Sequence, residues 1–370
     1  ESGKLNFING ICSSNTSIIS AGNNTITFNK FNNGTYDDCT FSVTDIAGNQ
    51  SYSISISEFT ISKQMWSQDA YVKASNSEGG DNFGGSSVSI SGDTMAVGVT
   101  GEDSCQATIT NGTSSSDNNS CSGSGAVFVY KLSGSNWVQE AYIKASNVDS
   151  GDQFGHSVDL DGDTLVIGVP KEASCQNTIT NGTTSSDNDT CQNSGAVYVY
   201  SRNGTNWAQQ AYIKASNNFY KSSSDYFQNE FGHSVSISGD TIAVGARYED
   251  GNNNGIVNGN IAPNYHNSSV KWSSGAVYVY KRNSGSWTQE AYIKASNSGA
   301  DDNFGTSVSI DNQTLVVGAP REDSNEISIF NGSSSSFDNS NRDSGAVYVY
   351  KRIGSSWAQE AYIKVQDSRS

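Results

Sequence analysis

The segment SGAVYVYKRNSGSWTQEAYIKASN, residues 274–297, recurs almost unchanged at 124–147 and 194–217, and again from Ser344 with its last three residues changed. Two further β-like runs and a Phe-Gly pair precede each copy. The pairs begin at Phe83, Phe154, Phe231 and Phe304, an interval of 71 to 77 residues. Self-similarity at such a period predicts an array of supersecondary units that bury their faces against one another.

Alternation inside the repeat predicts strands that are packed on both faces. In AVYVYK, Val277 and Val279 point to one face and Tyr278 and Tyr280 to the other. Each unit holds four such runs, and a four-stranded sheet with two buried faces needs a neighbour on each side, as blades around an axis provide. Five of the six tryptophans share one repeat position, which is more typical of packing than of a ligand platform; they are Trp66, Trp137, Trp207, Trp287 and Trp357.

Glycine and phenylalanine hold fixed places in each unit. Each repeat has a glycine late in its second run, which predicts the close approach of a neighbouring backbone. These glycines are Gly98, Gly168, Gly245 and Gly318. The phenylalanine of each Phe-Gly pair is interpreted as an anchor between units. Short polar turns such as SGD at 238–240 predict a tight hairpin between the first two runs.

The runs FGHSVSISGDTIAVGA (231–246) and FGTSVSIDNQTLVVGAP (304–320) resemble the Phe-Gly…Gly-Ala-Pro (FG-GAP) repeats of integrin α-subunit propellers and of many bacterial surface proteins. The resemblance extends from about Trp66 to Lys364. It implies an all-β fold, a β-propeller or propeller-like array of four FG-GAP-like four-stranded blades. As an indication of function it is weak, because this fold hosts adhesion, ligand binding and occasionally hydrolysis.

The resemblance also raises the question of calcium. Many members of the family carry an Asp-rich loop in the first hairpin, whereas this chain has only SGD, DGD or DNQ there, too few oxygens for a calcium shell. No cofactor is required by the sequence. Acidic residues still recur before the Phe-Gly pairs and after the second run, where turn and capping roles compete with cation binding; the candidate metal ligands are Asp81, Asp152, Asp302, Asp103, Asp250 and Asp323, and Glu102, Glu172, Glu249 and Glu322 lie beside them.

The number of repeats leaves ring closure open. There are four copies of the first three runs but five of the WxQxAYIK run, the extra one being WSQDAYVK at 66–73. Four blades either close into a small ring, or form an open array that another chain or further sequence completes. The extra run is a candidate for closing the ring.

Residues 1–62 have a different pattern and are expected to form a separate domain before the repeats at 63–370. GTYDDCTFSVTDIAGN, residues 34–49, resembles the later strands of bacterial immunoglobulin-like domains. The start of such a domain is missing, which predicts a partial sandwich. Either the chain is truncated there, or a strand from a neighbouring subunit fills the open edge.

Composition narrows the compartment and the partners. The net charge of −16 and the absence of a Lys/Arg cluster argue against nucleic acid, and no apolar run is long enough for membrane insertion. The six cysteines pair best as local disulfides, which indicates a secreted or cell-surface protein. The expected pairs are Cys12 with Cys39, Cys105 with Cys121, and Cys175 with Cys191.

No constellation for catalysis emerges from the residues. His156 and His233 share one repeat position, His266 stands alone, and nucleophile-elbow and phosphate-loop motifs are absent. Variable loops on a rigid scaffold are the usual place for binding; the candidate contact residues there are Tyr265, His266, Trp272, Phe330 and Phe337.

The sequence therefore favours a non-enzymatic extracellular protein that acts in adhesion or as a structural subunit. Its expected partners are other copies of itself, or a cell-surface protein or glycan. A glycan- or protein-binding module of a larger secreted protein is the alternative, and a propeller hydrolase a third interpretation.

Overall fold

The computed structural model describes residues 2–9, 18–19, 34–36, 39–57, 59–61, 68–218, 229–260 and 271–364. The chain divides into two compact units, Glu1–Tyr71 and Val72–Ser370. The boundary between them follows residue 71, nine residues after the boundary expected between residues 62 and 63. All regular structure within these ranges is β, and none of it is a helix that could cross a membrane.

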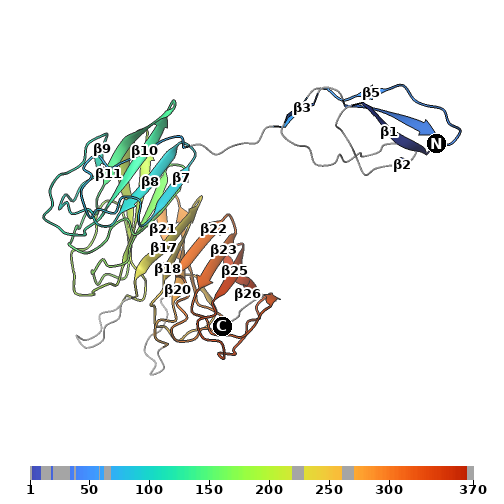
Figure 1. Ribbon diagram of the computed structural model, residues 1–370. Helices are drawn as coiled ribbons and strands as arrows, with labels where there is room; N and C mark the ends of the chain where they lie inside the picture. Colours follow the sequence, from blue (N-terminus) through green and yellow to red (C-terminus); the bar gives the residue numbers. More distant parts are fainter. Residues whose placement is uncertain are drawn as a thin grey trace. The chain divides into compact units, whose positions relative to one another are not determined.

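The second unit consists of four antiparallel sheets, one for each repeat (Figure 1). In order of pairing, the first sheet consists of β7 (Val88–Ser91), β8 (Thr94–Val99), β10 (Ala126–Ser133), β11 (Asn136–Ile143) and β9 (Thr110–Asn111), and the second of β12 (Ser157–Asp161), β13 (Thr164–Val169), β15 (Ala196–Asn203), β16 (Asn206–Ile213) and β14 (Ile179–Asn181). The third sheet consists of β17 (Phe231–Ser238), β18 (Thr241–Ala246), β20 (Ala276–Asn283), β21 (Ser286–Ile293) and β19 (Ile256–Asn258). The fourth consists of β22 (Ser307–Asp311), β23 (Thr314–Ala319), β25 (Ala346–Ile353), β26 (Ser356–Ile363) and β24 (Ile329–Asn331). The predicted all-β, propeller-like array of four sheets is confirmed. Each sheet has a fifth short strand that the pattern did not predict.

A two-residue turn joins the first two strands of each sheet. Ser238 pairs with Thr241, so Gly239 and Asp240 alone make the turn, and Gly239 has a φ of 57°. In the fourth sheet Asn312 takes that place with a φ of 55°, a conformation that asparagine tolerates better than most residues. The predicted tight hairpins are confirmed.

The two faces of each third strand pack into different cores. Val277 and Val279 lie in the cluster between the third and fourth sheets, whereas Tyr278 and Tyr280 lie in the cluster between the second and third sheets. The predicted alternation is therefore confirmed, and each sheet is buried on both sides because its neighbours supply apolar surface to both.

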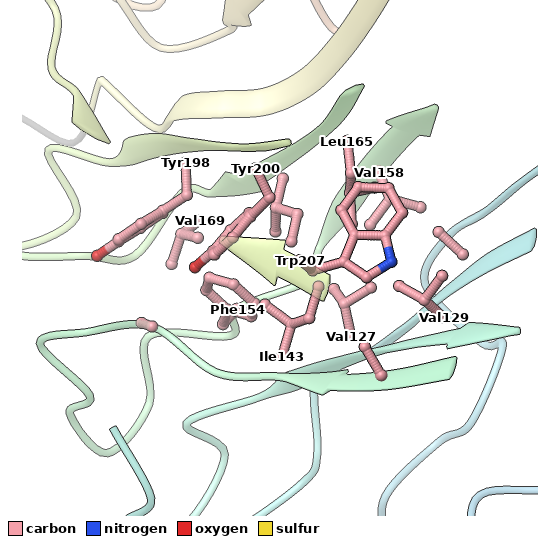
Figure 2. Packing of buried hydrophobic residues seen from close by; sticks show 14 of the residues in the cluster. Val127, Val129, Ile143, Phe154, Val158, Leu165, Val169, Tyr198, Tyr200 and Trp207 are labelled. Carbon is pink, nitrogen blue, oxygen red and sulfur yellow. The ribbon is translucent and has the colours of Figure 1, made fainter. Parts of the chain in front are cut away.

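The Phe-Gly pair anchors one sheet to the sheet before it. Figure 2 shows Phe154 between the tyrosines of its own sheet and Val127 and Ile143 of the preceding sheet. Its backbone forms a bridge with Gly125, and its ring meets that of Tyr198 edge-on at 5.4 Å. The same arrangement recurs at Phe231 and Phe304, so the anchor interpretation is confirmed.

The array has two outer faces. The first strands β7, β12, β17 and β22 contact one another in sequence. Ile90 of β7 is 63% exposed, whereas Leu160 at the same repeat position is 5% exposed. Val347 of β25 is 36% exposed, and its counterpart Val277 is fully buried. The described part of the extra run, residues 68–73, forms no strand, so the strand predicted there is wrong.

The first unit contains a sheet in the order β2 (Ile18–Ile19), β1 (Gly3–Asn9), β4 (Thr40–Asp45) and β5 (Ile54–Ser55), and a separate pair of β3 (Gly34–Tyr36) with β6 (Phe59–Ile61). Phe7 and Phe41 pack across β1 and β4 at 6.3 Å. Cys39 is buried and disulfide-bonded, but its expected partner Cys12 lies outside the described residues. The immunoglobulin-like interpretation stays a prediction.

Candidate functional site: the loops and the junctions between sheets

The long loop between the second and third strands folds back onto its own sheet. In each repeat a short strand in this loop pairs with the fourth strand, as Asn181 does with Ala211. The sequence signal is an asparagine followed by glycine, as in TNG at 110–112 and 180–182, VNG at 257–259 and FNG at 330–332. The first part of every loop is therefore fixed to the scaffold.

That asparagine also joins its sheet to the next one. Asn181 accepts a hydrogen bond from the backbone N–H of Trp287 at 2.7 Å and donates to its carbonyl at 3.2 Å. Asn111 makes the same pair with Trp207, and Asn258 with Trp357. These three tryptophans are nearly fully buried, so their predicted packing role is confirmed; Trp66 lies outside the described residues.

Disulfides close the first two loops around their short strands. Cys105 is bonded to Cys121 and Cys175 to Cys191, as predicted. The third and fourth loops have no cysteines. The loops thus share the short strand and differ in the segments around it.

The candidate contact residues fall into three groups. Trp272 is 52% exposed and Phe337 71% exposed, as expected for side chains offered to a partner. Phe330 is a correction: it lies in β24, is partly buried, and packs on Tyr362 at 5.9 Å, because the fifth strand turns it toward the core. Tyr265 and His266 lie outside the described residues.

The repeated glutamate after the second strand forms a buried ion pair. Lys294 Nζ lies 2.6 Å from Glu249 Oε2, and the side chains are fully buried. Tyr292 donates to the same carboxylate at 2.8 Å, and Asn217 of the preceding repeat does so at 3.0 Å. The other three pairs are Lys144 with Glu102, Lys214 with Glu172, and Lys364 with Glu322. Burial lowers the pKa of Lys214, and Glu172 opposes that shift.

The aspartates considered as metal ligands accept backbone hydrogen bonds at turns. Asp103, Asp250 and Asp323 bind the amides of Gly123, Ser273 and Asp343, respectively. Asp81 and Asp302 close short turns by binding the amides of Glu78 and Gly299. The capping interpretation accounts for these contacts, and within the described ranges no three His, Cys, Asp or Glu side chains are grouped as a metal site would require.

Asp152 belongs to an acidic group in the second repeat. Burial raises its pKa to about 8, and Glu172, Asp149 and Asp189 add to the shift. The pKa of Asp302 is raised to about 7, again mainly by burial. Both carboxyl groups are therefore partly or mostly protonated near neutral pH, and calcium at these positions stays a prediction.

The two histidines of the shared repeat position stack on each other. The rings of His156 and His233 are 4.9 Å apart, and Glu230 lies 3.5 Å from His233. Burial lowers the pKa of His156 to about 4, and His233 adds to the shift. A base of that strength removes protons poorly at neutral pH. His266 lies outside the described residues.

Comparison with known protein families gives one kind of match. The FG-GAP repeat matches four times, at residues 66–130, 137–200, 207–260 and 287–350, which together make up more than half of the chain. No curated protein sequence matches the chain. All four matched segments lie within or at the edge of the second unit, and the last three each begin in the fourth strand of one sheet and continue into the next sheet.

Proposed function

The chain belongs to the FG-GAP repeat family, and from this premise we propose that it is a non-enzymatic extracellular protein that acts in adhesion and assembly. The observation that carries the proposal is that the repeated polar residues make buried structural contacts, while exposed aromatic residues lie in the variable loops. The carboxylate of Glu249, for example, is bound by Lys294, Tyr292 and Asn217 in the interior. Three large exposed side chains, those of Trp272, Ile327 and Phe337, instead lie in the loops that vary.

Adhesion is supported by the loops of the third and fourth repeats. Trp272, Phe337 and Ile327 are all more than half exposed, and all lie between a second and a third strand. Aromatic side chains of this kind dominate many binding interfaces. Because the loops connect equivalent strands of stacked sheets, they offer a composite surface to a glycan or protein on another cell.

An extracellular place is supported by the disulfides and by the fold. Disulfides persist in oxidising compartments, and Cys105–Cys121 and Cys175–Cys191 are both formed. A non-enzymatic role is supported by the state of the titratable groups. The repeated carboxylates are paired with buried lysines, and His156 is a weak base.

Binding of the purified chain to immobilised cells and to a glycan array tests the adhesion half of this proposal. We expect saturable binding, with an apparent affinity about 10-fold lower in the double variant Trp272→Ala, Phe337→Ala, because losing aromatic anchors typically costs at least this factor. Ile353→Ala is the matched control. Ile353 is 74% exposed but lies at the opposite end of the sheet, at the turn between β25 and β26.

Two results would count against adhesion through the loops. One is the absence of saturable binding to every surface tested. The other is an equal loss in the Ile353→Ala control, which would place the contact elsewhere on the sheets. Thermal melting of each variant distinguishes a lost contact from a lost fold.

A further inference from the structure

We propose that the outer face of the fourth sheet binds the outer face of the first sheet of a second copy of this chain, head to tail. The inference deepens the assembly half of the proposed function and rests on it. The outer face of the fourth sheet is defined by Val316, Gly318, Ile329, Asn331 and Val347. The outer face of the first sheet is defined by Phe83, Val88, Ile90, Met95 and Trp137.

The three junctions inside the chain show what such a contact requires. A Cβ added at Gly245 would lie 2.0 Å from the carbonyl oxygen of Gly305 in the next Phe-Gly pair, and Ser234 donates to that same oxygen at 2.9 Å. Gly98 and Gly168 stand equally close to Gly155 and Gly232. Every inner junction therefore combines a Phe-Gly backbone, a glycine that makes room for it and a serine that binds it.

The fourth sheet carries the receiving half of this design. Gly318 and Ser307 repeat the glycine and the serine, but within the described residues a Cβ added at Gly318 would meet only Ser307. A groove of about 570 Å³ lies there, lined by Gly318, Gly345, Val347 and their neighbours. Gly345 occupies the position at which Gly275 forms its bridge with Phe304.

Two more features of the fourth sheet lack the contact that their counterparts make. Ile256 packs into the core between the third and fourth sheets, whereas Ile329 at the same repeat position is 61% exposed. Asn258 binds the backbone of Trp357, whereas the described residues show no hydrogen bond from the side chain of Asn331. Apolar surface and an amide are thus both left for an incoming sheet.

The first sheet carries the entering half. Phe83 packs against Phe128 and Tyr130 of its own sheet, as Phe304 packs against Tyr348 and Tyr350. Val88 and Ile90 are both 63% exposed, although their counterparts in the second and third sheets are nearly buried. Trp137 is only partly buried.

Equivalent repeat positions, taken from the inner junctions, predict which groups of the two outer faces would meet. Gly84 reaches Gly318 and Ser307, and the backbone of Trp137 reaches Asn331. Val88 and Ile90 cover the fourth sheet along β22. A second copy supplies all of these partners at once, because every chain carries one face of each kind. A head-to-tail contact between copies would repeat the arrangement of an inner junction.

Two departures make this contact weaker than an inner one. In the inner junction, Arg352 and Trp357 of the fourth sheet both bind Glu290 of the third sheet. The first sheet has Leu132 at the position of the arginine. In the contact between copies, Glu360, which corresponds to Glu290, would therefore bind only the indole of Trp137. The segment around Lys73 already covers part of the first sheet's outer face. Tyr130 donates a hydrogen bond to the carbonyl oxygen of Lys73, as Tyr200 does to that of Lys144 in the preceding sheet. In a head-to-tail pair the segment around Lys73 meets the end of β26 of the other copy, so one of the two must move aside.

The charge of the chain sets the salt dependence of the contact. With a net charge of −16, two copies repel each other, while the paired faces are mainly apolar. Salt screens that repulsion, so association strengthens as salt is raised. An interface held by ion pairs would respond in the opposite direction.

Sedimentation velocity of the full chain over a concentration series tests the proposal, with two variants that each block one face. Gly318→Val fills the receiving groove, and Val88→Asp places a charge on the entering face. We expect the natural sequence to form a concentration-dependent series of oligomers, and each variant alone to be monomeric, with association weakened at least about 10-fold. An equal mixture of the two variants retains one good face of each kind and stops at the dimer.

Every other result overturns the inference. A natural sequence that stays monomeric up to high concentration, with Gly318→Val lowering its melting temperature, would mean that the chain closes its own ring. Oligomers that persist in both variants would place self-association on another surface, such as the first unit. Because the adhesion assay uses Trp272 and Phe337, loss of self-association and loss of adhesion are separately observable.

Discussion

Gly245 and Gly318 hold the same repeat position in the third and fourth sheets, yet only one is enclosed. The carbonyl oxygen of Gly305 lies 2.0 Å from the place where a Cβ of Gly245 would be, whereas Gly318 faces the hydroxyl of Ser307 alone. At Gly245 the missing side chain is explained by the next sheet. At Gly318 no described residue explains it, which is expected of half of a contact whose other half is on another molecule.

The comparison extends from glycines to whole faces. Inner faces are buried, and each is crossed by a Phe-Gly bridge, by an asparagine bound to a tryptophan backbone, and by a second asparagine bound to the buried glutamate of the next repeat. The outer faces repeat much of this chemistry without the partner. Substitutions at matched repeat positions should therefore have different effects inside the array and at its ends.

The largest effect is expected at the buried ion pair within the third repeat. Glu249→Ala leaves Lys294 buried without its partner, and removing one member of a buried pair costs about 3–5 kcal/mol of unfolding free energy. Lys131→Ala breaks an exposed pair with Asp93 and should leave urea denaturation unchanged. Equal effects of the two variants would contradict the distinction between buried and exposed pairs.

The glycines themselves come next. Gly245→Ala forces two backbones apart, and overpacking of this kind costs about 1–3 kcal/mol. Gly318→Ala meets only a rotatable serine hydroxyl, so the unfolding free energy of dilute protein should change by no more than about 0.5 kcal/mol. Chemical denaturation of both variants at low concentration compares them. A large loss in Gly318→Ala would show that this face is covered within one chain.

A smaller difference is expected for the asparagines. Asn181→Ala leaves the backbone N–H of Trp287 without its acceptor, which costs about 1–2 kcal/mol for a buried donor. Asn331→Ala removes no hydrogen bond that the described residues show, so it should be nearly neutral in the monomer. Matching losses in melting temperature would indicate that Asn331 already has an intramolecular partner.

The smallest effect is a pH dependence at Asp152. The folded chain holds this proton up to about pH 8, while an unfolded aspartate releases it near pH 4. The unfolding free energy therefore falls as pH rises through that window, and we expect Asp152→Asn to remove about 1 kcal/mol of the fall between pH 7 and pH 8. Denaturation at pH 7 and pH 8 in metal-free buffer measures it; an unchanged slope would contradict the raised pKa.

The scaffold was predictable because its signals are local and repeated. Alternation in AVYVYK assigned Val277 and Tyr278 to opposite faces, and the glycine at 245 indicated a close backbone; both predictions are confirmed. The fifth strand was missed because it has only two or three residues, and its pairing partner lies about 30 residues further along the chain. Phe330 was misjudged for the same reason, since that strand turns it inward.

The junction chemistry needed three dimensions. Lys294 and Glu249 are 45 positions apart, and Asn181 and Trp287 are 106 apart. A single sequence shows that such residues recur, but not that they meet. The glutamates were accordingly left between capping and cation binding, although their carboxylates hold buried lysines.

Electron microscopy of the native full chain, without tags or reducing agent, shows whether the two outer faces meet between molecules or within one. We expect strings in which the fourth sheet of one molecule lies on the first sheet of the next, with Phe83 and Gly84 of the second molecule against Gly318 of the first. Discrete particles in which Gly318 and Gly84 of one chain meet in a closed four-bladed ring would contradict head-to-tail assembly.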